Sequence, residues 1–119
     1  MIGAALVGLV ALIHVTILLA EMLFWETPRV RRAFGMSEEL ASRTRVLAAN
    51  QGLYNGFLAA GLVWALVLGL PGEGASVAIF FLACVLVAGV FGAATASRRI
   101  LWVQALPGAL ALGAVLAEL

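Results

Sequence analysis

Four long apolar stretches constrain this chain more than any other feature of its sequence. They cover about residues 2–24, 46–70, 75–97 and 100–118, and a helix needs roughly twenty residues to cross a hydrocarbon core about 30 Å thick. Hydrophobic residues make up 65% of the chain and charged residues only 11%, whereas roughly a quarter of the residues are charged in soluble domains. So few charges could not cover the apolar surface of a soluble domain, and the sequence predicts an integral membrane protein.

The hydrogen-bonding needs of a membrane-spanning backbone narrow the fold to helices. A lipid-exposed segment must satisfy its own hydrogen bonds, and none of the four stretches alternates polar and apolar residues as a membrane β-strand does. Short turns join the later stretches, so sequential helices are expected to be antiparallel neighbours. The sequence therefore predicts an all-α fold, a four-helix transmembrane bundle in which residues 1–119 form a single integral membrane domain.

The arginines predict the orientation of this bundle. All seven basic residues are arginines, and they lie only in the connections after the first and third apolar stretches: Arg29, Arg31, Arg32, Arg43, Arg45, Arg98 and Arg99. Basic residues accumulate on the cytoplasmic side of membrane proteins, where they also meet anionic headgroups. We therefore expect a multi-pass protein of the cell membrane with both termini outside the cytoplasm. A net charge of +1 gives no reason to expect a nucleic-acid partner.

The connection between the first two stretches carries helix signals of its own. In the segment TPRVRRAFG, Thr27 is a typical N-cap, Pro28 fits the first helical position and Gly35 fits the C-terminal stop. These signals predict a short basic interfacial helix on the cytoplasmic membrane surface. Ser37 then caps a second helix, whose composition allows it to continue straight into the next apolar stretch.

Polar residues are concentrated in one half of the predicted bundle. His14 and Glu21 are seven residues apart, which is two helical turns, so they share one face of the first stretch. In the segment LAANQGLYNGFLAAG of the second stretch, Asn50 and Gln51 are expected at the depth of Glu21, and Tyr54 and Asn55 toward the depth of His14. We predict that the following side chains converge on a cytoplasm-facing polar pocket that binds a ligand: His14, Glu21, Asn50, Gln51, Tyr54, Asn55 and Gln104.

Each of these residues also has a purely structural interpretation. Amides often join membrane helices, aided by small residues such as the glycines of the same segment, and His14 alone would be a neutral hydrogen-bonding group. Glu21 is harder to explain in this way, because an ionisable side chain inside a span is unfavourable by about 2.5–3.5 kcal/mol without a partner or water. In the structural interpretation, the Glu21 side chain extends so that its carboxylate reaches the membrane–water interface. Glu26, at the border, is expected to be solvated or paired with Arg29.

Other chemistry has little support in the sequence. One histidine and one or two carboxylates are too few for a convincing metal site, so no metal is predicted. Cys84 is the single cysteine and lies in an apolar stretch, where a packing role is expected. No phosphate-binding loop, zinc signature or nucleophile elbow occurs. The sequence assigns no cofactor and leaves open whether the protein is an enzyme.

The segments AEMLFWETP and LAANQGLYNGFLAAGL, with the FG between them, resemble the signature of a known family. This is the small bacterial integral membrane protein family catalogued as domain of unknown function 1304. The resemblance covers nearly the whole chain, is strongest in its first half, and implies a four-span membrane protein without an established activity. Its motif positions in this sequence are Glu21, Trp25, Asn50, Gln51, Gly52, Tyr54, Asn55 and Gly56.

Two classes of function fit these residues, and a third interpretation involves no chemistry. The first is binding or transport of a small polar or cationic molecule, with Glu21 supplying charge, His14 exchanging a proton and the amides forming hydrogen bonds. The second is a membrane-embedded enzyme that uses Glu21 or His14 as acid or base on a lipid-like or quinone-like substrate. The third is a small membrane scaffold. The sequence contains neither a strong nucleophile nor a set of metal-ligating residues, and this favours binding or transport over catalysis.

A second copy of the chain is the one protein partner that the sequence suggests, in addition to the lipid bilayer. Glycine-rich faces such as GVFGAATA, residues 89–96, favour packing of one membrane helix against another. The one-sided distribution of arginines predicts that such a homo-oligomer is parallel.

Overall fold

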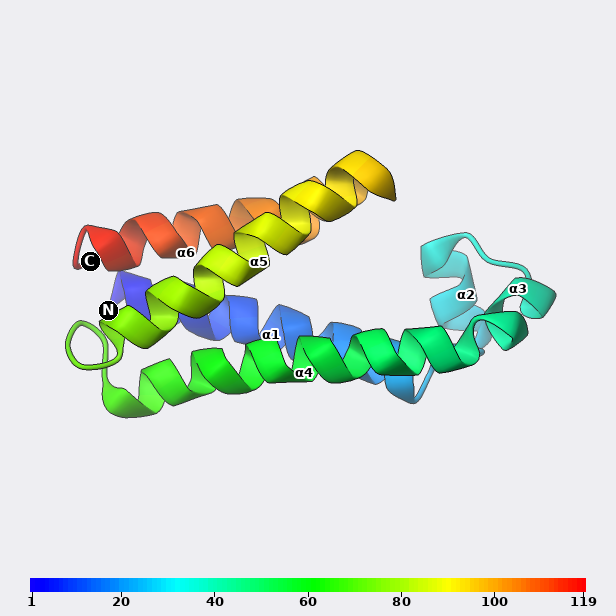
Figure 1. Cartoon of the computed structure of the whole chain (residues 1–119), viewed down its shortest axis with the longest axis horizontal. Coiled ribbons are helices and arrows are strands. Elements are labelled where there is room, and N and C mark those ends of the chain that lie inside the picture. Colours follow the sequence, from blue (N-terminus) through cyan, green and yellow to red (C-terminus); the bar gives the residue numbers. More distant parts are fainter. The chain divides into compact units, whose positions relative to one another are not determined.

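Helices account for all the regular secondary structure of this protein. The computed structural model describes residues 1–119, and its helices appear in Figure 1. In chain order they are α1 (Ile2–Met22), α2 (Pro28–Phe34), α3 (Glu38–Arg43), α4 (Arg45–Leu68), α5 (Ala75–Thr95), the π-helix η1 (Leu101–Ala105) and α6 (Leu106–Leu116). The prediction of an all-α fold is confirmed.

Three of these helices, α1, α4 and α5, are long and apolar enough to cross a membrane, which indicates a membrane protein. The fourth predicted stretch, about residues 100–118, contains η1 with five residues and α6 with eleven, and these together are shorter than each of the three long helices. In η1 the N–H of Leu106 donates to the carbonyl of Leu101, five residues earlier. Because the ring of Pro107 displaces the carbonyl four residues before it, the wider π-turn accommodates this proline inside an otherwise continuous helix.

The chain forms two compact units, and the long helices α1 and α4 each contribute to both of them. Unit 1 comprises Met1–Ile13 and Leu58–Leu119, and unit 2 comprises His14–Phe57.

Unit 1 contains the main apolar core. Its buried side chains come from α1, α4, α5 and α6, and the largest of them are Val7, Val10, Leu62, Leu82 and Val85. Helix α5 packs closely on η1 at Gly89: a Cβ atom added there would lie only 2.8 Å from the backbone nitrogen of Ala105. The turn between α4 and α5 uses Gly69 and Gly72 at positive φ, a conformation that side-chain-bearing residues rarely adopt. The N and C termini are adjacent, and the Met1 ammonium donates to the carbonyl oxygen of Leu119 at 2.8 Å (Figure 1).

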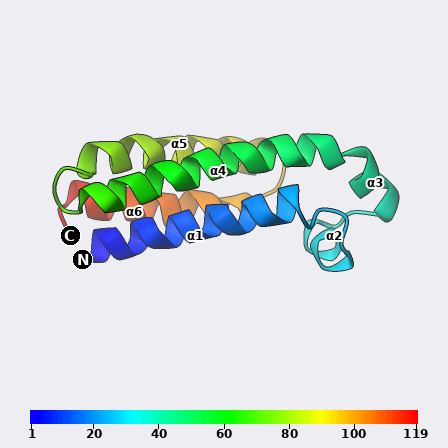
Figure 2. The ribbon, with the colours of Figure 1, turned by 90° about the horizontal axis from the view of Figure 1, so that it is seen from below.

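Unit 2 contains the C-terminal part of α1, the two short helices and the N-terminal part of α4. Figure 2 shows α1 and α4 side by side, with α2 and α3 in the connection between them. The predicted caps are confirmed: the Thr27 hydroxyl accepts from the N–H of Val30, the Ser37 hydroxyl accepts from that of Leu40, and Gly35 ends α2 in the left-handed conformation.

The second short helix does not continue directly into the next span. Helix α3 ends at Arg43, and α4 begins at Arg45 after a break at Thr44, whose φ and ψ are −105° and 6°. The Thr44 hydroxyl donates to the carbonyl of Leu40 and accepts a hydrogen bond from Trp25 Nε1 at 3.0 Å. A hydrogen bond from a residue 19 positions earlier therefore coincides with the break in the helix.

Candidate functional site

A hydrogen bond between a buried carboxylate and an amide joins α1 to α4 in unit 2. Glu21 lies in the last turn of α1 and is only 7% exposed. Its Oε1 accepts a hydrogen bond from Nδ2 of Asn55, on α4, at 2.8 Å. The same amide nitrogen donates to the backbone carbonyl of Gln51 at 3.1 Å, one helical turn earlier. Asn55 thus fixes the carboxylate relative to the backbone of α4.

Glycines on α4 make this contact possible because they let the two helices approach closely. A Cβ atom added at Gly52 would lie 2.5 Å from Cγ of Met22 and 3.1 Å from Cβ of Glu21. At Gly56 it would lie 2.7 Å from Cδ1 of Leu18. Small residues at this spacing are typical of close helix contacts in membranes. The two glycines flank the level at which Asn55 meets the carboxylate.

His14 is completely buried on α1, two turns before Glu21. No buried side-chain nitrogen or oxygen in the structure lacks a hydrogen-bond partner, so the imidazole is held in a satisfied environment. His14 and Glu21 are the only polar or charged residues in the buried set. The buried ionisable chemistry of the protein is therefore confined to one helix.

The remaining amides and the tyrosine lie in different surroundings. Asn50 is exposed and donates from Nδ2 to the carbonyl of Val46 on its own helix at 2.9 Å. Tyr54 is 62% exposed, and its ring lies against Phe57 with centroids 5.9 Å apart. Gln51 is also exposed, although its backbone carbonyl accepts from Asn55. These three side chains are therefore not part of the Glu21–Asn55 contact.

Gln104, the last of the predicted site residues, belongs to η1 in unit 1 and is partly buried. Cys84, expected to be a packing residue, is a free cysteine that is partly buried on α5. No group of three or more histidine, cysteine, aspartate or glutamate side chains is arranged so as to hold a metal ion.

Sequence reasoning missed a second set of contacts near the buried pair. Trp25, three residues beyond the end of α1, donates to Thr44 and also lies against Phe34 of α2, with ring centroids 5.1 Å apart. Glu26 forms an ion pair with Arg45 at 3.6 Å, where a pairing with Arg29 or full solvation had been expected. The aromatic character of Trp25 and its place in the family motif were the available signals.

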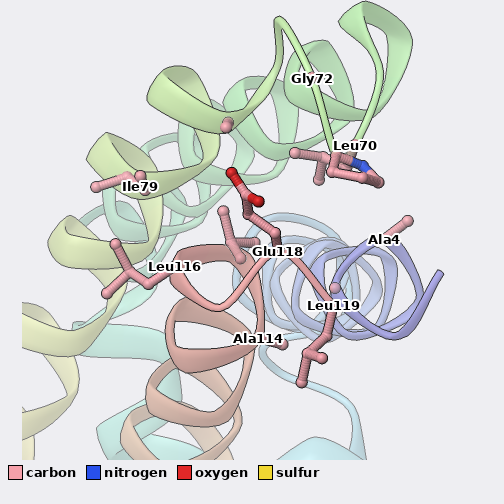
Figure 3. Close-up of a pocket in the computed structure, with 12 residues that line it drawn as sticks. Ala4, Leu70, Gly72, Ile79, Ala114, Leu116, Glu118 and Leu119 are labelled. Carbon is pink, nitrogen blue, oxygen red and sulfur yellow. The ribbon is translucent and has the colours of Figure 1, made fainter.

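Two of the open cavities of this protein are lined by none of the predicted site residues. One, in unit 1, has a volume of about 250 Å³ and lies beside the chain termini and the turn between α4 and α5 (Figure 3). Its lining is mostly apolar, including Leu70, Ile79 and Leu116, and Glu118 supplies the one ionisable side chain. The other is an open groove of about 390 Å³ in unit 2, between the end of α1 and the start of α2.

These features define a class of protein: a small all-helical chain with three helices able to cross a membrane and a buried carboxylate held by an amide of a neighbouring helix. Within that class, the sequence model of the family described as Protein of unknown function (DUF1304) matches residues 8–116, and the chain belongs to this family. The resemblance expected from the sequence is confirmed. No curated protein and no solved structure matches the chain.

Proposed function

We propose that this protein is a four-span membrane protein that binds or transports a small polar or cationic molecule, with Glu21 as the charged group of its site. The observation that carries the proposal is the burial of this carboxylate against Asn55, at 2.8 Å, within helices able to cross a membrane. An ionisable group inside a span is unfavourable by about 2.5–3.5 kcal/mol. One polar contact between membrane helices contributes on average only about 0.6 kcal/mol, so the contact alone does not offset that cost, which supports a functional role.

In this proposal η1 and α6 form the fourth span. At about 1.5 Å per residue their sixteen residues, five in η1 and eleven in α6, reach about 24 Å, short of a core about 30 Å thick. Arg98 and Arg99, directly before this segment, can extend their charged ends to the interface and so tolerate a shorter span. All seven arginines then lie on the cytoplasmic side, with α2 on that membrane surface and both termini opposite.

The proposal gives the two buried ionisable residues of α1 distinct roles. Glu21 supplies negative charge for a cation or a polar group, and His14, two turns away on the same helix, exchanges a proton. Asn55 holds the carboxylate in position. Asn50, Gln51 and Tyr54 contribute only where a bound molecule extends over the exposed surface of α4.

Cation-dependent stability and flux test this proposal. The purified full chain is heated in detergent with sodium, potassium or tetramethylammonium chloride, and proteoliposomes carrying a pH-sensitive dye are given gradients of the same cations. We expect a cation-dependent rise in Tm, or a cation-driven proton flux, that Glu21→Gln abolishes while helix content stays unchanged. Glu73→Gln, an exposed carboxylate in the turn between α4 and α5, is the matched control and should keep the response. A Glu21→Gln protein that responds like the wild type would sink the proposal.

Two other functions predict different results. A membrane-embedded enzyme using Glu21 or His14 as acid or base is supported by the complete burial of His14, since a site that excludes water prevents loss of the transferred proton to solvent. It predicts turnover of lipid-like or quinone-like substrates in detergent that is lost in His14→Gln. A scaffold without chemistry predicts that Glu21→Gln stabilises the protein, because a buried charge is removed, and changes no other property.

A further inference from the structure

The groove in unit 2 is apolar over most of its length and cationic at one end. It has a volume of about 390 Å³ and is lined by Thr16, Leu19, Ala20, Phe24, Thr27, Arg29 and Val30. The first three lie at i, i+3 and i+4 on one face of α1, and the last two lie in the first turn of α2. The groove therefore follows α1 to its end and continues onto the basic helix.

Arg29 is the one charged side chain in the lining of this groove. It is exposed and forms no ion pair, and the hydroxyl of Thr27 is engaged in bonds to Phe24 and Val30. Arg31 and Arg32 follow on α2 with no acidic residue between Thr27 and Met36, and Glu26 is paired with Arg45. The charged end of the groove therefore has an unbalanced positive potential that suits an anion.

The position of the groove on α1 determines which kind of anion fits. Helix α1 is apolar enough to cross a membrane and ends at Met22, so in the topology proposed above Leu19 and Ala20 lie where the hydrocarbon core ends. Arg29 lies beyond the end of that helix, at the level of the lipid headgroups. An occupant must therefore combine a hydrocarbon chain with an anionic group at one end. We propose that this groove binds an anionic glycerophospholipid, with an acyl chain along α1 and its phosphate beside Arg29.

Native mass spectrometry of the full chain in detergent tests this inference with an equimolar mixture of dioleoylphosphatidylglycerol and dioleoylphosphatidylcholine. The wild type is expected to retain phosphatidylglycerol preferentially. Arg29→Gln should lower that retention about fivefold, equivalent to the roughly 1 kcal/mol that one basic residue contributes near an anionic surface. Arg98→Gln removes an exposed arginine outside the groove and should leave retention unchanged.

A second variant tests the apolar part of the groove. Ala20→Leu fills the space beside Leu19, so it should lower retention of both lipids, whereas Ala94→Leu, an exposed position on α5, should lower neither. Glu21→Gln should retain phosphatidylglycerol like the wild type, so failure of the proposed function would not be mistaken for failure of the lipid site. Adding inorganic phosphate should not displace the lipid.

Three results would overturn the inference. The first is equal retention of the two lipids by the wild type. The second is an equal loss in Arg29→Gln and Arg98→Gln, which would mean that total positive charge attracts the lipid and not this groove. The third is full displacement by inorganic phosphate, which would make the site one for a free anion.

Discussion

The close approach of α1 and α4 at Gly52 can be tested by adding a single methyl group. In Gly52→Ala the new Cβ atom would lie 2.5 Å from Cγ of Met22, 3.1 Å from Cβ of Glu21 and 3.3 Å from the carbonyl oxygen of Leu18. The side chain of Met22 is 40% exposed and can turn away. The other two atoms belong to the helix backbone or are bonded directly to it, so α1 must shift by a few tenths of an ångström. That shift lengthens the hydrogen bond between Asn55 and the carboxylate.

The expected destabilisation combines two opposing effects. Overpacking a close contact costs about 1–3 kcal/mol, and replacing a mid-helix glycine with alanine recovers about 0.5–1 kcal/mol. We expect Gly52→Ala to lose about 1–2 kcal/mol. Gly56→Ala should lose less, because its Cβ would meet only the flexible end of Leu18. Gly113→Ala is the matched control, since nothing lies within 4 Å of its Cβ, and it should be neutral or up to about 1 kcal/mol more stable.

Unfolding by sodium dodecyl sulfate, followed by circular dichroism of the full chain in mixed micelles, measures these differences. A loss of about 1.4 kcal/mol corresponds to a tenfold change in the unfolding equilibrium constant, well within reach of such a titration. The expected order of stability is Gly113→Ala, then Gly56→Ala, then Gly52→Ala. If Gly52→Ala unfolds with the same free energy as Gly113→Ala, the helices are not in close contact at this position and the reasoning fails.

Three further predictions use the same preparation. Asn55→Leu leaves the buried Glu21 carboxylate without its amide partner and should destabilise the protein by about 1–2 kcal/mol. Asn50→Leu, at an exposed position, should change the free energy of unfolding by less than about 0.5 kcal/mol. Equal effects of the two substitutions would contradict the placement of these two side chains. Gly89→Ala should lower the yield of folded protein, because its Cβ would meet the backbone of Ala105 at 2.8 Å; monodisperse elution in normal yield would refute this. Trp25→Phe removes a hydrogen bond of 3.0 Å and should cost about 0.5–1.5 kcal/mol; an unchanged midpoint would show that the bond contributes nothing.

The caps of the short helices could be predicted because each depends on one residue and the backbone beside it. Thr27, Ser37 and Gly35 act over four residues or fewer, so their effect is visible in the sequence. The break at Thr44 could not be predicted, because it coincides with a hydrogen bond from Trp25, 19 residues earlier. The sequence between Ser37 and Thr44 contains neither the glycine nor the proline that usually marks a helix end.

Depth along the helices was not enough to predict which polar side chains of the candidate site meet. Equal depth along antiparallel helices predicted that Glu21 lies level with Asn50 and Gln51, whereas the amide that contacts Glu21 is that of Asn55, one helical turn beyond Gln51 on α4. Grouping by depth alone also included Asn50 and Tyr54, which lie about 140° and 100° away from Asn55 around a helix that turns about 100° per residue. The small residues Ala48 and Gly52, on the same face as Asn55, are both buried, so this is the face of α4 that packs.

The glycines and the buried carboxylate depend on each other, and this dependence predicts that their substitutions are not additive. The short side chain of Asn55 reaches Glu21 only because Gly52 lets the two backbones approach. Because Gly52→Ala separates the helices and weakens the hydrogen bond between Asn55 and Glu21, Asn55→Leu then removes less stabilisation. The double variant should therefore be more stable than the sum of the single losses implies, by at least about 0.5 kcal/mol in a double-mutant cycle of detergent unfolding free energies. Strict additivity would mean that helix approach and carboxylate binding are independent, and that the Gly52 and Asn55 positions of the family motif act for separate reasons.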